Sequence, residues 1–147
     1  MADIERRALV KGAALGALAF TVGGTTVMLT AKQARAVNVP YRMLKEHEAA
    51  TLAALGETLV PGARDAGMAH FIDQQISVPP EEALLQARIL HVRPPFVNLY
   101  RAAIGAVDGA SNKIHGKKFV ELSPETQREF VGLITRIDLI NYLRRAA

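Results

Sequence analysis

The sequence predicts an all-α protein, a small bundle of about five short helices preceded by an N-terminal signal or anchor helix. Apolar residues recur at three- and four-residue spacing through the second part of the chain, as they do on one face of a helix. Pro and Gly pairs divide that part into short segments. No run of alternating apolar and polar residues indicates a strand.

The first 36 residues have the layout of an export leader. A charged start is followed by an apolar stretch over 12–31, which is about 20 residues and roughly long enough for a helix to cross a bilayer core. Paired arginines ahead of such a stretch indicate the twin-arginine route. The predicted export signal comprises this pair, two apolar residues and a lysine: Arg6, Arg7, Leu9, Val10 and Lys11.

The leader is expected either to be cleaved or to be retained as a membrane anchor. Ala34 and Ala36 flank Arg35 as small residues and predict cleavage before Val37. Alternatively the stretch stays uncut as a membrane anchor, although its Gly and Thr residues make it only mildly apolar. A soluble core helix is disfavoured because the stretch has no polar face. The predicted units are therefore a twin-arginine signal peptide over 1–36 and one helical domain over 37–147.

Charge and cysteine content limit the functions open to the domain. Five basic and two acidic residues in 1–36 account for most of the net charge of +4, so the rest of the chain is nearly neutral. No basic stripe with interleaved aromatic residues remains, and we expect no nucleic-acid partner. The chain has no cysteine, which excludes disulfides, thiolate metal sites and covalent c-type haem attachment.

The first two predicted helices meet at a Pro-Gly corner. A helix over 45–59 carries Leu52, Leu55 and Leu59 on one face, and Pro61-Gly62 ends it. A shorter helix follows Asp65. Its apolar face holds Met68, Phe71, Ile72 and Ile76.

Three further helices are expected. One over 81–91 lies between the pairs Pro79-Pro80 and Pro94-Pro95. The next begins near Phe96, buries Tyr100 and stops at Gly109, before a polar loop over 110–118. The last begins at Ser123, which caps it, and Pro124 takes its first position.

No catalytic, cofactor-binding or metal-binding residue is predicted from the sequence. There is no glycine-rich phosphate or dinucleotide motif, and the four histidines lie more than 20 residues apart. The run Glu46-His47-Glu48 is better read as exposed helix surface than as a metal site, because adjacent helix positions point apart. His70 could pair with Asp73, although a partly buried imidazole is the favoured interpretation.

Two motifs resemble the gluconate 2-dehydrogenase subunit 3 family, the small subunit of membrane-associated flavin-dependent dehydrogenases. The first is TLAALGETLVPGARDAGMAHFIDQQI, with its Leu-rich helix, the run 57–62 and Phe71-Ile72-Asp73. The second is Phe119 followed by the run 122–128, LSPETQR. The resemblance covers most of the chain. Its motifs mark structure, so no catalytic residue is carried over.

The resemblance implies partners and a place in the cell. In that family a large glucose–methanol–choline-type subunit binds FAD and oxidises a sugar, sugar acid or alcohol, and a cytochrome c subunit with haem c often receives the electrons. The small subunit binds the large one, helps it mature and supplies the twin-arginine signal. The expected location is the periplasmic side of the inner membrane, reached through the twin-arginine translocase, with membrane contact through the N-terminal helix.

Short amphipathic helices can leave an apolar face to bury on such a partner. The residues expected to contact the large subunit come from the first two helices and the Pro-rich segment: Leu52, Leu55, Pro61, Phe71, Ile72, Pro79, Pro80, Pro94 and Pro95. The alternative is a stand-alone periplasmic binding module anchored by an uncut leader. A small hydrolase or metal enzyme has little support, because no nucleophile and base are visible together.

Overall fold

The computed structural model describes residues 16–146, with backbone only for Gln86, Arg88 and 137–146. The described part is mostly helical, with one small two-stranded sheet. The predicted export signal (Arg6, Arg7, Leu9, Val10 and Lys11) lies outside the described residues.

A β-hairpin replaces part of the expected leader helix. Strands β1 (Leu18–Val22) and β2 (Thr25–Leu29) pair antiparallel, with Leu18 opposite Leu29. The turn is Gly23-Gly24, and both glycines have positive φ, as two-residue hairpin turns require. The helix prediction over 12–31 is therefore wrong for 18–29, because this turn is flanked by the β-branched Thr and Val residues that favour strands. No helix within residues 16–146 is long and apolar enough to cross a membrane.

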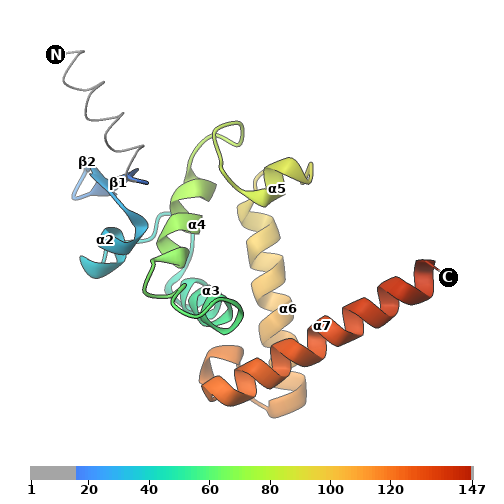
Figure 1. Cartoon of the computed structure of the whole chain (residues 1–147). Helices are drawn as coiled ribbons and strands as arrows, with labels where there is room; N and C mark the ends of the chain where they lie inside the picture. Colours follow the sequence, from blue (N-terminus) through green and yellow to red (C-terminus); the bar gives the residue numbers. More distant parts are fainter. Residues whose placement is uncertain (1–15, 147) are drawn as a thin grey trace.

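Helix α2 (Ala31–Ala36) contains both residues of the predicted cleavage site. Thr30 and Gln33 cap it reciprocally through their side chains. Ala34 is fully buried and packs with Phe20 of β1 and with Val39. The hairpin and α2 thus lie on α4 (Met68–Ser77), as Figure 1 shows at the blue end of the chain.

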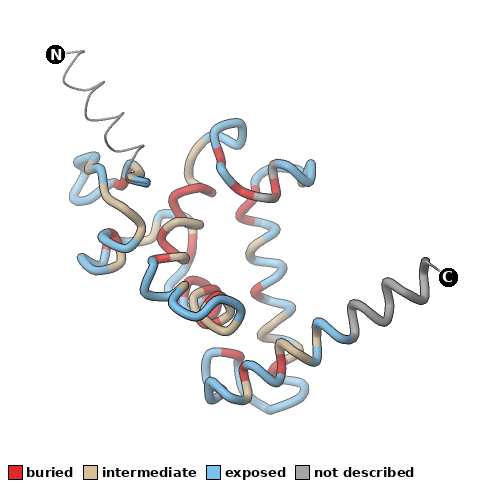
Figure 2. Tube along the Cα trace, in the orientation of Figure 1, coloured by how far each residue is buried: buried red, intermediate tan, exposed pale blue. Residues whose placement is uncertain are grey.

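Helix α3 (Glu46–Leu59) is the centre of the fold and contacts α4, α6 (Val97–His115) and α7 (Pro124–Ala146). Figure 2 shows buried residues concentrated on α3 and α4. Leu52 is buried among residues of α4 and α6, as predicted. Leu59 is 60% exposed, so its assignment to the buried face is wrong. The helix ends beside it, and the chain turns away at Pro61.

Helix α4 begins after Gly67 as predicted, but the expected helix over 81–91 shrinks to α5 (Gln86–Ile89). Residues 79–83 form turns instead. The side-chain oxygen of Gln75 accepts the backbone N–H of Leu84, which fixes a non-helical path. Ala83 and Leu85 are buried against Phe96. Tertiary contacts therefore override the local helix propensity of this segment.

Helix α6 begins where expected but continues past Gly109 to His115, so the predicted loop over 110–118 is mostly helix. An interior Gly costs a helix only about 1 kcal/mol, which packing can offset. Ser111 is fully buried, and its hydroxyl donates to the carbonyl of Lys117. The helix ends at Gly116, whose φ of 68° is the left-handed conformation typical of such ends.

The last two elements close the second part of the core. A 3₁₀ turn, η1 (Phe119–Glu121), precedes α7, and the N–H of Thr126 donates to the hydroxyl of Ser123, which confirms the predicted cap. Phe119 and Phe130 pack with ring centroids 5.6 Å apart. The C-terminal half of α7 extends away from the other helices in Figure 1.

Candidate partner interface

Most buried polar groups in the described residues are structural. Asp73 of α4 is 4% exposed, and its carboxylate accepts the backbone N–H groups of Arg42, Met43 and Leu44 at 2.8–2.9 Å. His70 does not pair with Asp73. Its Nε2 donates to the carbonyl of Val39 at 3.0 Å, so the interpretation as a buried imidazole is confirmed.

Glu48 is the one buried member of the run Glu46-His47-Glu48. Its carboxylate accepts the N–H of Lys45 at 2.8 Å and the Nε of Arg101 at 3.0 Å. Burial raises the pKa of Glu48, but the Lys45 hydrogen bond and the Arg101 charge outweigh it, and the pKa lies below its ordinary value. Glu48 thus links α3 to α6. Among the side chains that the structure describes, no cluster of His, Asp or Glu has a geometry that could hold a metal ion.

The Pro-Gly corner between α3 and α4 is held by Glu57. Its two carboxylate oxygens accept the backbone N–H groups of Gly62 and Arg64, each at 3.0 Å. These two hydrogen bonds, followed by the charge of Arg64, lower the pKa of Glu57. The closed loop presents Leu59, Val60 and Pro61 to solvent. The motif Glu57-Thr58-Leu59-Val60-Pro61-Gly62 therefore builds an exposed apolar corner.

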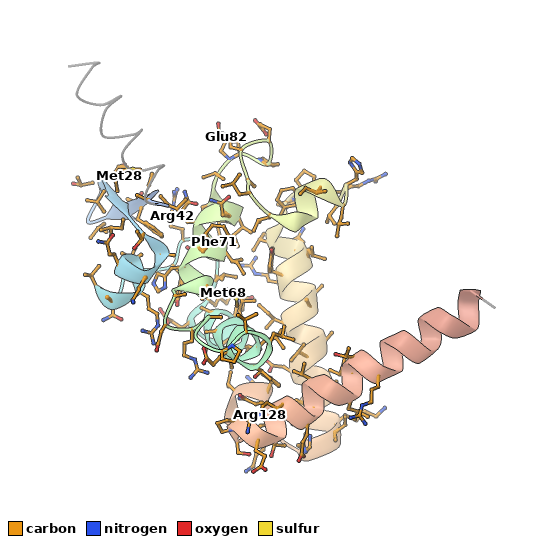
Figure 3. The ribbon with its side chains drawn as sticks, viewed as in Figure 1. Met28, Arg42, Met68, Phe71, Glu82 and Arg128 are labelled. Atoms are coloured by element: carbon orange, nitrogen blue, oxygen red, sulfur yellow. The ribbon has the colours of Figure 1, made fainter. Side chains whose placement is uncertain are left out.

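A pocket of about 300 Å³, which we call the corner pocket, opens beside this corner. Residues of the second motif complete it, because α7 packs on α3. The pocket is lined by side chains from both motifs: Glu57, Thr58, Pro61, Arg64, Pro124, Gln127 and Arg128. Figure 3 shows Arg128 on α7, below the end-on view of α3. The two segments that carried the family resemblance thus meet at one place on the surface.

A second apolar surface surrounds α5. Leu84, Ile89 and Leu90 are 71%, 68% and 65% exposed. A hollow of about 380 Å³ is lined by Leu84 and Ile89 together with Ala83 and Leu85. Single exposed leucines are common, but Leu84 and Ile89 line one hollow and Leu90 is exposed next to Ile89 in the sequence, which is typical of an interaction surface. We call Leu84, Ile89 and Leu90 the α5 surface.

The residues predicted to contact a partner divide into two groups. Leu52 is a core residue, and Leu55, Phe71 and Ile72 are half-buried against the core clusters. These side chains hold the fold together and leave little surface for a partner. The prolines of the set are all exposed: Pro61, Pro79, Pro80, Pro94 and Pro95.

Sequence reasoning missed the most exposed apolar side chains. Leu59 is the last residue of the helix predicted over 45–59, and Leu84, Ile89 and Leu90 lie inside the helix predicted over 81–91. The signal that could have found them is their place beside the Pro breaks, where a helix cannot continue to cover them.

Comparison with known proteins identifies the family. The model of the family described as Gluconate 2-dehydrogenase subunit 3 matches residues 46–138, which is more than half of the chain. The match includes the corner pocket and the α5 surface, whereas the hairpin and α2 lie before it. No curated protein and no solved structure matches the chain. The chain belongs to the gluconate 2-dehydrogenase subunit 3 family.

Proposed function

We propose that this chain is the non-catalytic small subunit of a flavin-dependent dehydrogenase complex that oxidises a sugar, a sugar acid or an alcohol. It binds the large FAD-containing subunit, supports its maturation and escorts it through the twin-arginine pathway. Family membership supports the assignment to a dehydrogenase complex. The α5 surface is the single structural observation that favours partner binding, because it leaves three large apolar side chains in water.

Covering the α5 surface would contribute favourably to a contact with a partner. Burying a Leu or Ile side chain contributes about 1.5–3 kcal/mol. Leu84, Ile89 and Leu90 are each about two-thirds exposed, so the three together offer several kcal/mol when a partner covers them. The buried centre of a protein interface is more apolar than its polar rim, and the α5 surface has this apolar composition.

The export part of the proposal rests on the leader. The twin-arginine route carries folded cargo, and a folded complex of this chain with a flavoprotein would need only one signal. The proposed signal is Arg6-Arg7 with Leu9, Val10 and Lys11. FAD belongs to the large subunit in this proposal, and haem c to a further cytochrome subunit. The complex then works at the periplasmic face of the inner membrane.

Export can be tested with a matched pair of variants in the native host. Arg6→Lys/Arg7→Lys changes the signal, and Arg144→Lys/Arg145→Lys makes the same change in a second arginine pair of the chain. We expect the first variant to leave the flavoprotein in the cytoplasm and the second to export it normally. Normal export of the flavoprotein in the first variant would refute the escort function.

A further inference from the structure

The corner pocket has a composition that suits a particular kind of ligand. Its walls come from positions 57–64 and 124–128, brought together by the packing of α7 on α3. Gln127, which also lines the pocket, is buried and donates to the carbonyl of Phe119 at 3.0 Å. Thr58 donates to the carbonyl of Ala54 at 2.8 Å. These two polar side chains are already hydrogen-bonded and hold the pocket in shape.

Two arginines with no hydrogen-bonding or ion-pair partner among the described residues line the pocket. Arg64 and Arg128 are both exposed, and neither guanidinium makes an ion pair or a hydrogen bond within the described part of the chain. The only carboxylate in the lining is that of Glu57, and both of its oxygens accept backbone N–H groups. The pocket therefore carries excess positive charge with free donors.

Apolar surface lies next to these arginines. The rings of Pro61 and Pro124 line the pocket, and Leu59 and Val60 beside it are 60% and 63% exposed. A ligand that fits both features has an apolar side chain and a carboxylate close together. Arg recognises carboxylates through paired, charge-assisted hydrogen bonds, which gives such a site directional specificity.

We propose that the corner pocket receives a segment of the large flavoprotein subunit in which an apolar side chain stands beside an Asp or Glu. The apolar side chain packs on Pro61 and Pro124, and the carboxylate binds Arg64 and Arg128. This inference rests on the proposed function and adds the chemistry of one contact to it. The competing occupant is the C-terminal carboxylate of a second copy of this chain.

Charge reversal tests the contact in the intact complex. Arg64→Glu/Arg128→Glu is compared with Arg42→Glu, since Arg42 is exposed and lies well away from Arg128 in Figure 3. We expect the double variant to bind the purified flavoprotein about 10- to 100-fold more weakly, because this is the range for loss of one or two close charge pairs. The Arg42→Glu control should bind the flavoprotein as the wild type does. Added salt should weaken the wild-type complex more than the Arg64→Gln/Arg128→Gln complex.

Zero-length cross-linking identifies the partner group directly. Arg128→Lys places an amine at the pocket while keeping its charge, and a carbodiimide then joins that amine to a carboxylate in contact with it. We expect cross-linked peptides between position 128 and an Asp or Glu side chain of the large subunit. The Arg42→Lys complex, treated in the same way, should give no such link from position 42.

The possible outcomes separate the two proposals. Wild-type affinity in Arg64→Glu/Arg128→Glu, or a link from position 128 to the C-terminus of a second copy, overturns the pocket assignment and leaves the proposed function standing. If the wild-type chain binds no flavoprotein at all, the proposed function fails, and the pocket assignment fails with it.

Discussion

The carboxylate of Asp73 accepts the backbone N–H of Leu44 at 2.8 Å, across 29 positions of the chain. Because the same carboxylate also accepts the N–H groups of Arg42 and Met43, it fixes the loop that leads into α3. Leu44 is buried against Leu52 and Ile104. This side chain thus ties the loop before α3 to α4.

Asp73→Asn should destabilise the protein by about 1–3 kcal/mol, since an amide has a single acceptor oxygen and the partly buried N–H of Arg42 would lose its partner. Asp65→Asn is the control, because the Asp65 side chain is 79% exposed and its ion pair with Arg35 lies on the surface. Chemical denaturation of the two variants measures the difference. Equal stability of both variants and the wild type would contradict the structural function given to Asp73.

Gly67→Ala should destabilise the docking of α2 on α4. A Cβ at this position would clash with the carbonyl oxygen of Ala31, and the φ of 80° is unfavourable for any L side chain. We expect a loss of at least about 1–2 kcal/mol, read from thermal unfolding. Gly105→Ala lies in α6 with nothing within 4 Å of the new Cβ, so it should stabilise by about 0.5–1 kcal/mol. A stabilising Gly67→Ala would mean that α2 does not pack as described.

Phe20→Ala should destabilise the uncut chain by about 3 kcal/mol, because Phe20 is 6% exposed and packs on Ala34 and Val39. Val22→Ala, at an exposed hairpin position, should have little effect. A chain that starts at Val37 loses the same contacts and should be less stable than the uncut chain. Identical unfolding curves for the two chain lengths would show that the hairpin contributes nothing.

Acid should weaken the contacts of Glu48 and Glu57. Both carboxyls have a pKa lowered from the ordinary value of 4.5, so each stabilises the fold fully above that pH. This stabilisation is lost as the pH falls through the lowered folded-state pKa. Glu48→Gln should therefore lose less stability than the wild type between pH 5 and pH 3, roughly the window of carboxyl titration. Parallel pH profiles for variant and wild type would contradict this account.

Local sequence patterns predicted the helices whose ends are marked by Pro, Gly or a capping residue. The corner at Pro61-Gly62, the start of α4 after Gly67 and the cap at Ser123 all follow from short-range backbone chemistry. The family could be recognised from the motifs that build the corner and the start of α7. These motifs encode local geometry, which a single sequence displays directly.

The parts that sequence reasoning missed depend on distant partners. The path of 79–85 depends on the hydrogen bond from Leu84 to Gln75, and the part of α6 beyond Gly109 carries the buried Ser111, which donates to the carbonyl of Lys117. The hairpin over 18–29 was missed because its apolar stretch has the length and composition of a leader. The pocket could not be predicted, since Arg64 and Arg128 come together only through the packing of α3 on α7.

The flavin content of the isolated complex tests the central claim most directly. The tagged full chain is purified from the native host, and bound flavin is measured by absorbance for the wild type, Leu84→Ser/Ile89→Ser and Val22→Ala. We predict a flavoprotein bound in fixed ratio to the wild type and to Val22→Ala, and most of it lost from the α5-surface variant. A wild-type chain that purifies alone and without flavin would contradict the account.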